Sequence, residues 1–163
     1  MKLDRIDLSI LRILQESGKI TNVQLSKKVG LSPGPTLERV RKLESAGIIE
    51  SYHAKLNKSR MGLGFTAFIN VTLTRQKNNA IANFLEFVQK TDEITSCWQL
   101  TGTYDYQLHV VVRDIPSFES LIDEKLSQVE EIGSMHTTVV LSEIKNNPVM
   151  PLDYKQDTIK LSE

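Results

Sequence analysis

The hydrophobic positions of the first sixty residues predict short helices separated by glycine. The first helix is predicted from apolar residues that fall on one helical face, namely Leu3, Ile6, Ile10, Ile13 and Leu14. Gly18 ends this pattern. Thr21, with Gln24 three residues later, predicts a capping box that opens a second helix, and Gly30 ends that helix.

A third helix follows after one apolar residue, with Ser32 as its N-cap and Pro33 in its first turn. Two short helices joined by so tight a turn form a helix-turn-helix, whose second helix enters the major groove of DNA. Residues 48–54 have strand character, which predicts a wing or a connector to the next domain. The inner side of the third helix is predicted to hold Leu37, Val40, Leu43 and Gly47.

The second half of the chain changes to a mixed pattern of strands and helices. Alternating residues predict strands over 65–74, 95–101, 106–112 and 135–144, and helical spacing predicts helices over 81–88 and from Pro116 onward. The order β-α-β-β-α-β is the ferredoxin-like pattern, so the fold class is α+β. Both helices would cover one sheet face. Dimerisation of two sheets would cover the other, which is expected to carry Thr66, Phe68, Cys97, His109, Val111 and Val140.

These patterns divide the chain into four parts. We expect a winged helix-turn-helix domain over residues 1–50, a linker over 51–63, a ferredoxin-like domain over 64–146 and a polar C-terminal tail over 147–163. The net charge of zero conceals an asymmetry, because residues 1–60 hold 12 basic and 6 acidic residues. The first part of the chain is therefore basic and the remainder acidic, which favours a polyanionic partner for the first part.

The polar residues of the second and third predicted helices suit contact with double-stranded DNA. Arg41 and Lys42 are long donors for guanine edges or phosphates, and Glu38 can accept from cytosine. Lys27 and Lys28 are placed to meet phosphates. The other DNA-binding candidates begin the third helix or lie at the border of its outer side, and they are Ser32, Pro33, Gly34, Pro35, Thr36 and Arg39.

The chain resembles the Lrp/AsnC family, the feast/famine regulators, and within it the leucine-responsive type. The resemblance covers roughly residues 3–146 and is most specific in Leu31-Ser32-Pro33-Gly34-Pro35-Thr36-Leu37-Glu38-Arg39-Val40-Arg41-Lys42-Leu43-Glu44. It also includes Leu3-Asp4-Arg5-Ile6-Asp7, Gly47-Ile48-Ile49, Gly102-Thr103-Tyr104-Asp105-Tyr106 and Thr138-Val139-Val140-Leu141. It implies a winged helix-turn-helix and an effector domain of the RAM type.

The resemblance also implies an effector site and an assembly. Family members form homodimers that assemble into octamers or other higher oligomers, and amino acids bound at dimer–dimer contacts alter assembly or DNA affinity. The effector-binding candidates are therefore Gly102, Thr103, Tyr104, Asp105, Thr138, Val139 and Val140. Gly102 would let a ligand approach the backbone, and Asp105 could accept from an α-ammonium group. Thr138 stands where leucine-type members often carry a larger aromatic group.

The remaining residues give no support for catalysis. His53, His109 and His136 are far apart and have no metal-ligand spacing, so no metal or cofactor is expected. The one cysteine, Cys97, allows no intramolecular disulfide, and no signal peptide or membrane span is evident, so a cytoplasmic location is expected. We expect a DNA-binding transcriptional regulator that responds to a small molecule. The alternatives are an effector-independent architectural DNA-binding protein and, with less support, an enzyme with a ferredoxin-like fold.

Overall fold

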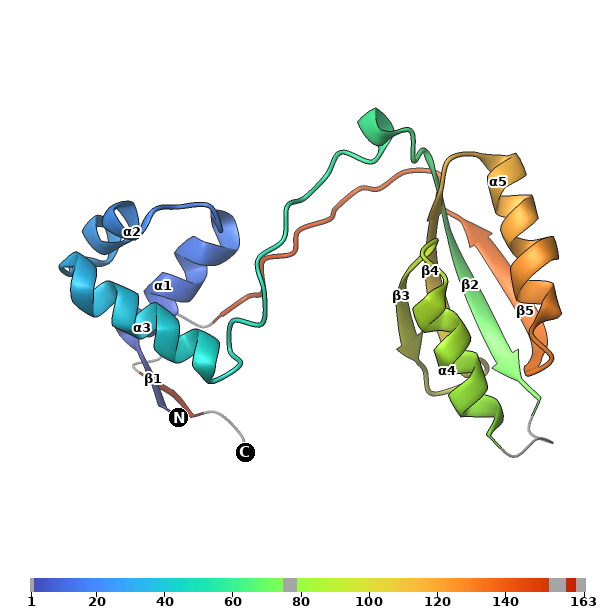
Figure 1. Ribbon diagram of the computed structural model, residues 1–163, viewed down its shortest axis with the longest axis horizontal. Coiled ribbons are helices and arrows are strands. Elements are labelled where there is room, and N and C mark those ends of the chain that lie inside the picture. The colour runs from blue at the N-terminus through green and yellow to red at the C-terminus, as the bar shows by residue number, and fades with distance from the viewer. Residues whose placement is uncertain (1, 75–78, 153–157, 161–163) are drawn as a thin grey trace. The chain divides into compact units, whose positions relative to one another are not determined.

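The computed structural model describes residues 2–74, 79–152 and 158–160 (Figure 1). The chain divides into two compact units. The helix-turn-helix unit holds the residues up to Lys55 together with those from Lys145 onward, and the sheet unit holds Leu56–Ile144.

Three helices build the helix-turn-helix unit, as the sequence predicted. They are α1 (Arg5–Glu16), α2 (Asn22–Val29) and α3 (Pro33–Ser45). The predicted capping box of Thr21 and Gln24 is present at the start of α2. Gly30 ends α2 with a left-handed φ of 73°, a conformation that glycine adopts without steric cost. The capping box and the turn at Gly30 thus set where α2 begins and ends, and α3 begins only a few residues after it.

The C-terminal segment of the chain belongs to this unit rather than forming a separate tail. Strand β6 (Thr158–Lys160) pairs antiparallel with β1 (Lys2–Asp4), with Leu3 opposite Ile159. Leu152 packs against the core of the three helices. That core consists of Leu3, Leu8, Ile10, Leu11, Leu25 and Leu43. The first residues were predicted as helix, but Leu3 lies in β1 and still contributes its side chain to the core.

The strand predicted over residues 48–54 is not present. Gly47 has a left-handed φ of 68° after α3, and the amides of Ile48 and Ile49 both donate to the carbonyl of Leu43. The amides of Ile48 and Ile49 are therefore not available to pair with another strand. The same turn packs both side chains against the helical core. The segment is therefore a connector without strand pairing.

The sheet unit has the ferredoxin-like topology that the sequence predicted. Its four strands are β2 (Phe65–Leu73), β3 (Ile94–Gln99), β4 (Tyr106–Val112) and β5 (Ile132–Val139). They lie in the order β3-β4-β2-β5, with antiparallel neighbours throughout. The other elements are η1 (Ser59–Met61), α4 (Ala80–Lys90), α5 (Ile115–Ser120) and two further turns of helix over Leu121–Lys125 and Leu126–Gln128.

Helices α4 and α5 cover the same face of the sheet (Figure 1). Their inner residues pack on alternate residues of the strands, and the buried core of this unit includes Ile69, Val71, Phe84, Leu108, Val110, Leu121 and Leu126. We call the opposite side of the sheet the open face. This arrangement places the end of β2 and the start of β4 beside the start of α4, where a cavity forms.

Two details of the sheet differ from the sequence prediction. Cys97 was expected on the open face, but it is paired with Leu108 and packs against the helix-covered core. A register shift between Ile94 and Ser96 turns the strand over at this point. The last strand ends at Val139 rather than Ile144, and beyond it the amide of Val140 makes one more bond, to the carbonyl of Thr66 on β2.

Candidate DNA-binding surface and effector cavity

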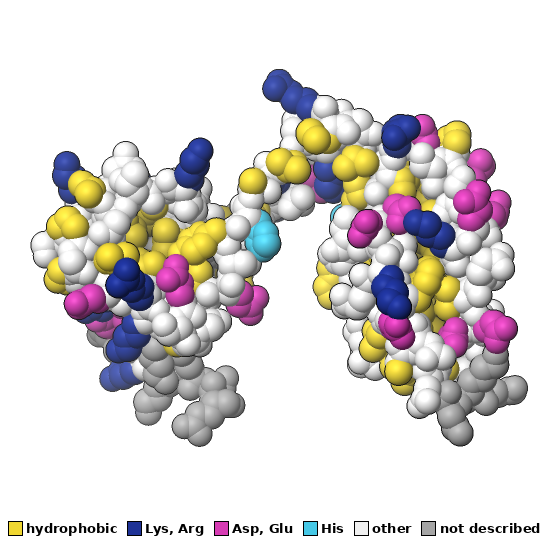
Figure 2. Space-filling view, in the orientation of Figure 1, with side chains coloured by type: hydrophobic (Ala, Val, Ile, Leu, Met, Phe, Trp, Pro, Cys, Tyr) yellow, Lys and Arg dark blue, Asp and Glu magenta, His cyan; other side chains and the backbone are white. Residues whose placement is uncertain are grey.

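The outer face of α3 carries most of the DNA-binding candidates. Gly34, Glu38, Arg41 and Ser45 follow one another at helical spacing and are all exposed. Pro33, Pro35 and Lys42 are exposed beside this line. The surface of the helix-turn-helix unit shows Lys and Arg side chains over α2 and α3 (Figure 2). A helix that presents such donors beside compact residues can approach base edges closely.

The first turn of α3 is held against α2. The side-chain amide Nδ2 of Asn22 donates to the carbonyl of Pro33 over 2.8 Å. The amide of Leu31 donates to the carbonyl of Ser26 over 3.0 Å and closes the turn between the two helices. Ser32 occupies the N-cap but makes no side-chain capping bond. Lys27 and Lys28 are exposed in the last turn of α2, where the helix dipole favours cations.

Two residues predicted to bind DNA are engaged inside the unit instead. The side chain of Thr36 is fully buried, and its hydroxyl donates to the carbonyl of Ser32 over 2.9 Å. Nη1 of Arg39 lies 2.7 Å from a carboxylate oxygen of Asp4 and 2.7 Å from one of Asp7. Thr36 therefore has no exposed atom for DNA, and the geometry assigns Arg39 to the junction of α3 with α1.

This cluster also changes the acid–base behaviour of Asp4. Burial alone raises the pKa of Asp4, but hydrogen bonds from the Asp7 amide and from Arg39 outweigh it, so the pKa lies below its ordinary value. Asp4 and Asp7 additionally form the capping box of α1. The start of α1 is therefore stabilised in the form where Asp4 is ionised.

Sequence reasoning missed one residue on the outer face of α3. Leu37 was predicted to lie inside, but its side chain is 38% exposed, four residues before Arg41 on the same side. The buried side is marked by Thr36 and Leu43, one heptad apart. The seven-residue spacing of Thr36 and Leu43 was the one sequence signal for the buried side of α3. It was missed because a pattern drawn from hydrophobic residues leaves out a buried threonine.

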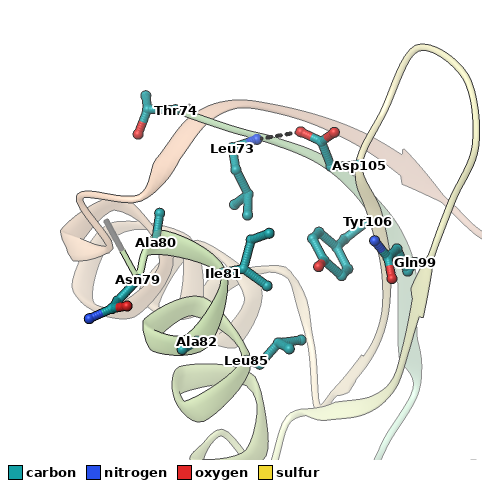
Figure 3. Close-up of a pocket in the computed structure, with 10 residues that line it drawn as sticks. All are labelled: Leu73, Thr74, Asn79, Ala80, Ile81, Ala82, Leu85, Gln99, Asp105 and Tyr106. Carbon is teal, nitrogen blue, oxygen red and sulfur yellow. Dashed lines mark hydrogen bonds between the residues drawn. The ribbon is translucent and has the colours of Figure 1, made fainter. Parts of the chain in front are cut away.

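A cavity of about 730 Å³, which we call the α4 cavity, opens in the sheet unit between the start of α4 and the sheet. On this side of the unit, hydrophobic side chains reach the surface between charged ones (Figure 2). Figure 3 shows Ile81 and Leu85 of α4 pointing toward Tyr106 of the sheet. The full lining is Leu73, Thr74, Asn79, Ala80, Ile81, Ala82, Leu85, Gln99, Asp105 and Tyr106. An apolar cavity with a few polar groups is the usual form of a small-molecule site.

Among the described residues that line this cavity, Asp105 is the one that carries a charge. Its Oδ2 accepts a hydrogen bond of 2.8 Å from the amide of Leu73, drawn as a dashed line in Figure 3. Its own amide donates to Val71 over 2.9 Å, and its carbonyl accepts from Leu100 over 2.8 Å. Within the described part of the chain, Oδ1 has no hydrogen-bond partner. The backbone therefore fixes a carboxylate at the cavity wall with one oxygen left for a ligand.

The rest of the Gly102–Asp105 hairpin lies outside the cavity lining. Gly102 is exposed with a φ of 116°, which an L-residue rarely adopts. Thr103 is exposed as well, and the ring of Tyr104 lies 6.1 Å from the ring of His136 on β5. These residues shape the hairpin that carries Asp105, while Asp105 alone of the four reaches the cavity.

The second group of effector candidates lies elsewhere on the sheet. Thr138 pairs with Phe68 and Val139 with Ala67, and the amide of Val140 donates to Thr66. The amide of Asp105 donates to the carbonyl of Val71, which lies three residues beyond Phe68 on β2. At strand spacing this is about 10 Å from the Phe68–Thr138 pair. One copy of the chain therefore does not bring the two groups together. Several lining residues were not predicted, among them Gln99 and Tyr106, which are paired across β3 and β4.

No group of three or more His, Cys, Asp or Glu side chains among the described residues could hold a metal ion. No helix in this part of the chain is long and apolar enough to cross a membrane.

Comparison with known proteins connects both units to one family. Residues 66–150 match the family model described as the Lrp/AsnC ligand-binding domain, and residues 3–50 match a winged helix-turn-helix DNA-binding model. The chain belongs to the Lrp/AsnC family. It is thus a DNA-binding transcriptional regulator with a ligand-binding domain, as the resemblance had implied.

Individual Lrp/AsnC proteins match along nearly the whole chain. The leucine-responsive regulatory protein of Klebsiella pneumoniae is 41% identical over 89% of this chain and 88% of its own. The L-Met complex of a transcriptional regulator from Neisseria meningitidis has a TM-score of 0.91 and 38% identity, covering 94% of this chain and 99% of that one. An AsnC family regulator from Agrobacterium tumefaciens has a TM-score of 0.88 and 31% identity, covering 94% and 100%.

Proposed function

We propose that this Lrp/AsnC protein binds specific DNA sites through the outer face of α3 and that an amino acid bound in the α4 cavity changes its assembly or its DNA affinity. The effector-binding part of this proposal rests on the carboxylate of Asp105, which the backbone holds at the wall of a mainly apolar cavity. We assign DNA binding to residues 1–50 and effector binding to 64–146. Because the partner is chromosomal DNA, we propose a cytoplasmic location.

On the DNA side, Arg41 has the central role. It lies midway along the exposed line of α3, and its guanidinium suits the two acceptors of a guanine edge. Glu38, one turn earlier, is placed to accept from a cytosine amino group. Lys27, Lys28 and Lys42 would neutralise phosphates, and each phosphate contact steepens the dependence of affinity on salt. Pro33, Gly34 and Pro35 would let the start of α3 approach the groove.

On the effector side, the cavity favours an amino acid with an apolar side chain. Oδ1 of Asp105 would accept from the α-ammonium group, while Leu73, Ile81 and Leu85 offer an apolar wall to the side chain. Gln99 adds an amide for a further polar contact. The related regulator from Neisseria meningitidis was crystallised with L-Met, which is an amino acid of this class.

Assembly would complete the site. The open face carries Phe68, His109 and Trp98, the last 47% exposed, and we propose that two copies pair through it. Homodimers would then join into an octamer or another higher oligomer. Thr138, Val139 and Val140 lie three to five residues along β2 from the Asp105 end of the sheet, or about 10–17 Å away in one copy, so a neighbouring copy would have to bring them to an effector. A ligand that prefers one assembly would shift the population toward it.

Calorimetric titration with each of the common amino acids tests the proposal. We expect an apolar amino acid to bind the wild type, and Asp105→Asn to raise its dissociation constant at least about tenfold, because a charge-assisted hydrogen bond is lost. Asparagine keeps an oxygen for the amide of Leu73, so the hairpin is retained. Asp92→Asn, an exposed carboxylate outside the cavity, is the matched control. Unchanged binding in Asp105→Asn would refute the site.

A further inference from the structure

The helix-turn-helix unit has a cavity of its own, of about 640 Å³. We call it the α1 cavity. Its walls come from the end of α1, from the connector that follows α3 and from the C-terminal segment. The lining residues are Leu14, Gln15, Ser17, Gly18, Lys19, Ser51, Tyr52, His53, Ala54 and Pro148. All of them belong to this one unit.

The walls of the α1 cavity are fixed by hydrogen bonds. The hydroxyl of Tyr52 donates to Glu44 over 3.0 Å, and its ring lies against Gly18, with Cδ1 at 3.5 Å from the position a Cβ would take. Burial first, and then the bond to Glu44, raise the pKa of Tyr52 to about 12, so the hydroxyl keeps its proton. The amide of Met150 donates to Oε1 of Gln15 over 2.6 Å and ties the C-terminal segment to α1.

The polar groups of this cavity favour an anion. Lys19 is the only Lys or Arg in the lining, and no Asp or Glu lines the cavity among the described residues. The hydroxyl of Ser17 adds a donor, and the hydroxyl of Ser51 lies 2.6 Å from Nε2 of His53, which also lines the cavity. Nε2 of Gln15 is buried without a hydrogen-bond partner in the described part of the chain. An unpaired buried donor is costly, and a carboxylate oxygen at the Gln15 wall would give it a partner.

The charged side chains in the described linings of the two cavities therefore have opposite sign. The described lining of the α4 cavity has the carboxylate of Asp105 and no Lys, Arg or His, which suits a ligand with an ammonium group. The described lining of the α1 cavity has the ammonium of Lys19 and no carboxylate, while Leu14, Ala54 and Pro148 supply an apolar part. We propose that the α1 cavity binds a small monocarboxylate with an apolar body and no ammonium group, of the 2-oxo acid class.

Such a ligand would act where the helix-turn-helix unit is attached to the rest of the chain. Residues 51–54 leave the unit toward Lys55, and Pro148 lies on the segment that returns to it after Lys145. A carboxylate bound between these segments and α1 would hold all three together. The regulator would then take two inputs, an amino acid in the sheet unit and a carboxylate without an amine in the DNA-binding unit.

Isothermal titration of the full-length chain with 4-methyl-2-oxopentanoate and with leucine, which share a side chain, tests the proposal. We expect the 2-oxo acid to bind the wild type, and both Lys19→Met and Gln15→Glu to raise its dissociation constant at least about tenfold. Gln15→Glu keeps the oxygen that accepts from Met150 but replaces the donor by a negative charge. Lys145→Met, an exposed lysine outside the cavity, should bind like the wild type.

The outcomes decide the proposal without reference to the amino-acid site. Absence of 2-oxo acid binding to the wild type, or equal binding by the wild type and Lys19→Met, would overturn it. Should Gln15→Glu fail to fold, Lys19→Met decides alone, because Lys19 is exposed. Inorganic phosphate that binds as tightly as the 2-oxo acid would overturn the requirement for an apolar body. Retained 2-oxo acid binding by Asp105→Asn is expected, since Asp105 lines the other cavity.

Discussion

Nη1 of Arg39 on α3 lies 2.7 Å from Oδ1 of Asp7 near the start of α1. The side chain of Asp7 is only 10% exposed, so this ion pair is shielded from water on one side. The same Nη1 meets Asp4, which is more exposed. Arg39 and Arg41 lie two residues apart on one helix, yet the first faces the protein and the second faces solvent.

Replacement of Arg39 by alanine should destabilise the helix-turn-helix unit. The change leaves the mostly buried carboxylate of Asp7 without its partner, and we expect the free energy of unfolding to fall by about 1–3 kcal/mol. Urea denaturation of the variant and the wild type measures this. Arg41→Ala should stay within about 0.5 kcal/mol of the wild type, because surface substitutions outside such contacts are nearly neutral. Equal stability of the Arg39→Ala variant and the wild type would contradict the role assigned here.

The same cluster predicts an acid-sensitive contribution to stability. Because the folded-state pKa of Asp4 is below its ordinary value of 3.8, the ionised form stabilises the fold at higher pH. That contribution is complete above the ordinary pKa and is lost as the pH falls through the lowered value. The gap in unfolding free energy between the wild type and Arg39→Met should therefore shrink between pH 6 and pH 3. A gap independent of pH over this range would be inconsistent with the cluster.

The sequence predicted the helices of the first unit well because their signals are local. The Thr21–Gln24 capping box and Gly30 act within one or two turns, and the structure has both. The ion pairs of Arg39 could not be predicted from such local signals. They depend on Asp4 and Asp7, which are more than thirty residues away in sequence and meet α3 only after the helices have packed.

The C-terminal segment should contribute to the stability of the helix-turn-helix unit. Leu152 packs, partly buried, against the core of α1, α2 and α3. Leu152→Ala removes part of that contact, and we expect a loss of about 1 kcal/mol in the free energy of unfolding. Leu141→Ala is the control, since Leu141 is 97% exposed. Comparable effects of the two substitutions in denaturant titrations would argue against docking of the segment.

Gly102 should affect the stability of the sheet unit through its backbone conformation alone. Its φ of 116° is strained for alanine, although nothing lies within 4 Å of an added Cβ. We expect Gly102→Ala to lower the unfolding free energy of the sheet unit by about 1–3 kcal/mol and to weaken effector binding at Asp105. Gly34→Ala, which also has open space but no positive φ, should be neutral or slightly stabilising in its helix. Thermal denaturation at one protein concentration compares the two, and a neutral Gly102→Ala would contradict the strain.

Long-range packing also explains what the sequence left out of the effector site. The hairpin from Gly102 to Asp105 could be found, but Ile81 and Leu85 follow an ordinary helical pattern, and only the packing of α4 beside β4 makes them a cavity wall. The face of the sheet on which the Cys97 side chain lies depends on a register shift near Ile94, and no periodic pattern predicts that shift. Docking of Leu152 on the first unit likewise depends on a contact between the two ends of the chain.

The central claim is that the outer face of α3 recognises DNA sequence, and a binding titration of Arg41→Ala tests it most directly. The probe is the duplex that the wild type selects from a random library, with a scrambled duplex of equal length for non-specific binding. Arg60→Ala removes one exposed positive charge from the sheet unit and serves as the control.

We predict that Arg41→Ala reduces the preference for the selected duplex about 5- to 150-fold while its stability is unchanged, and that Arg60→Ala keeps that preference. A variant Arg41→Ala that discriminates between the two duplexes as well as the wild type would contradict the account.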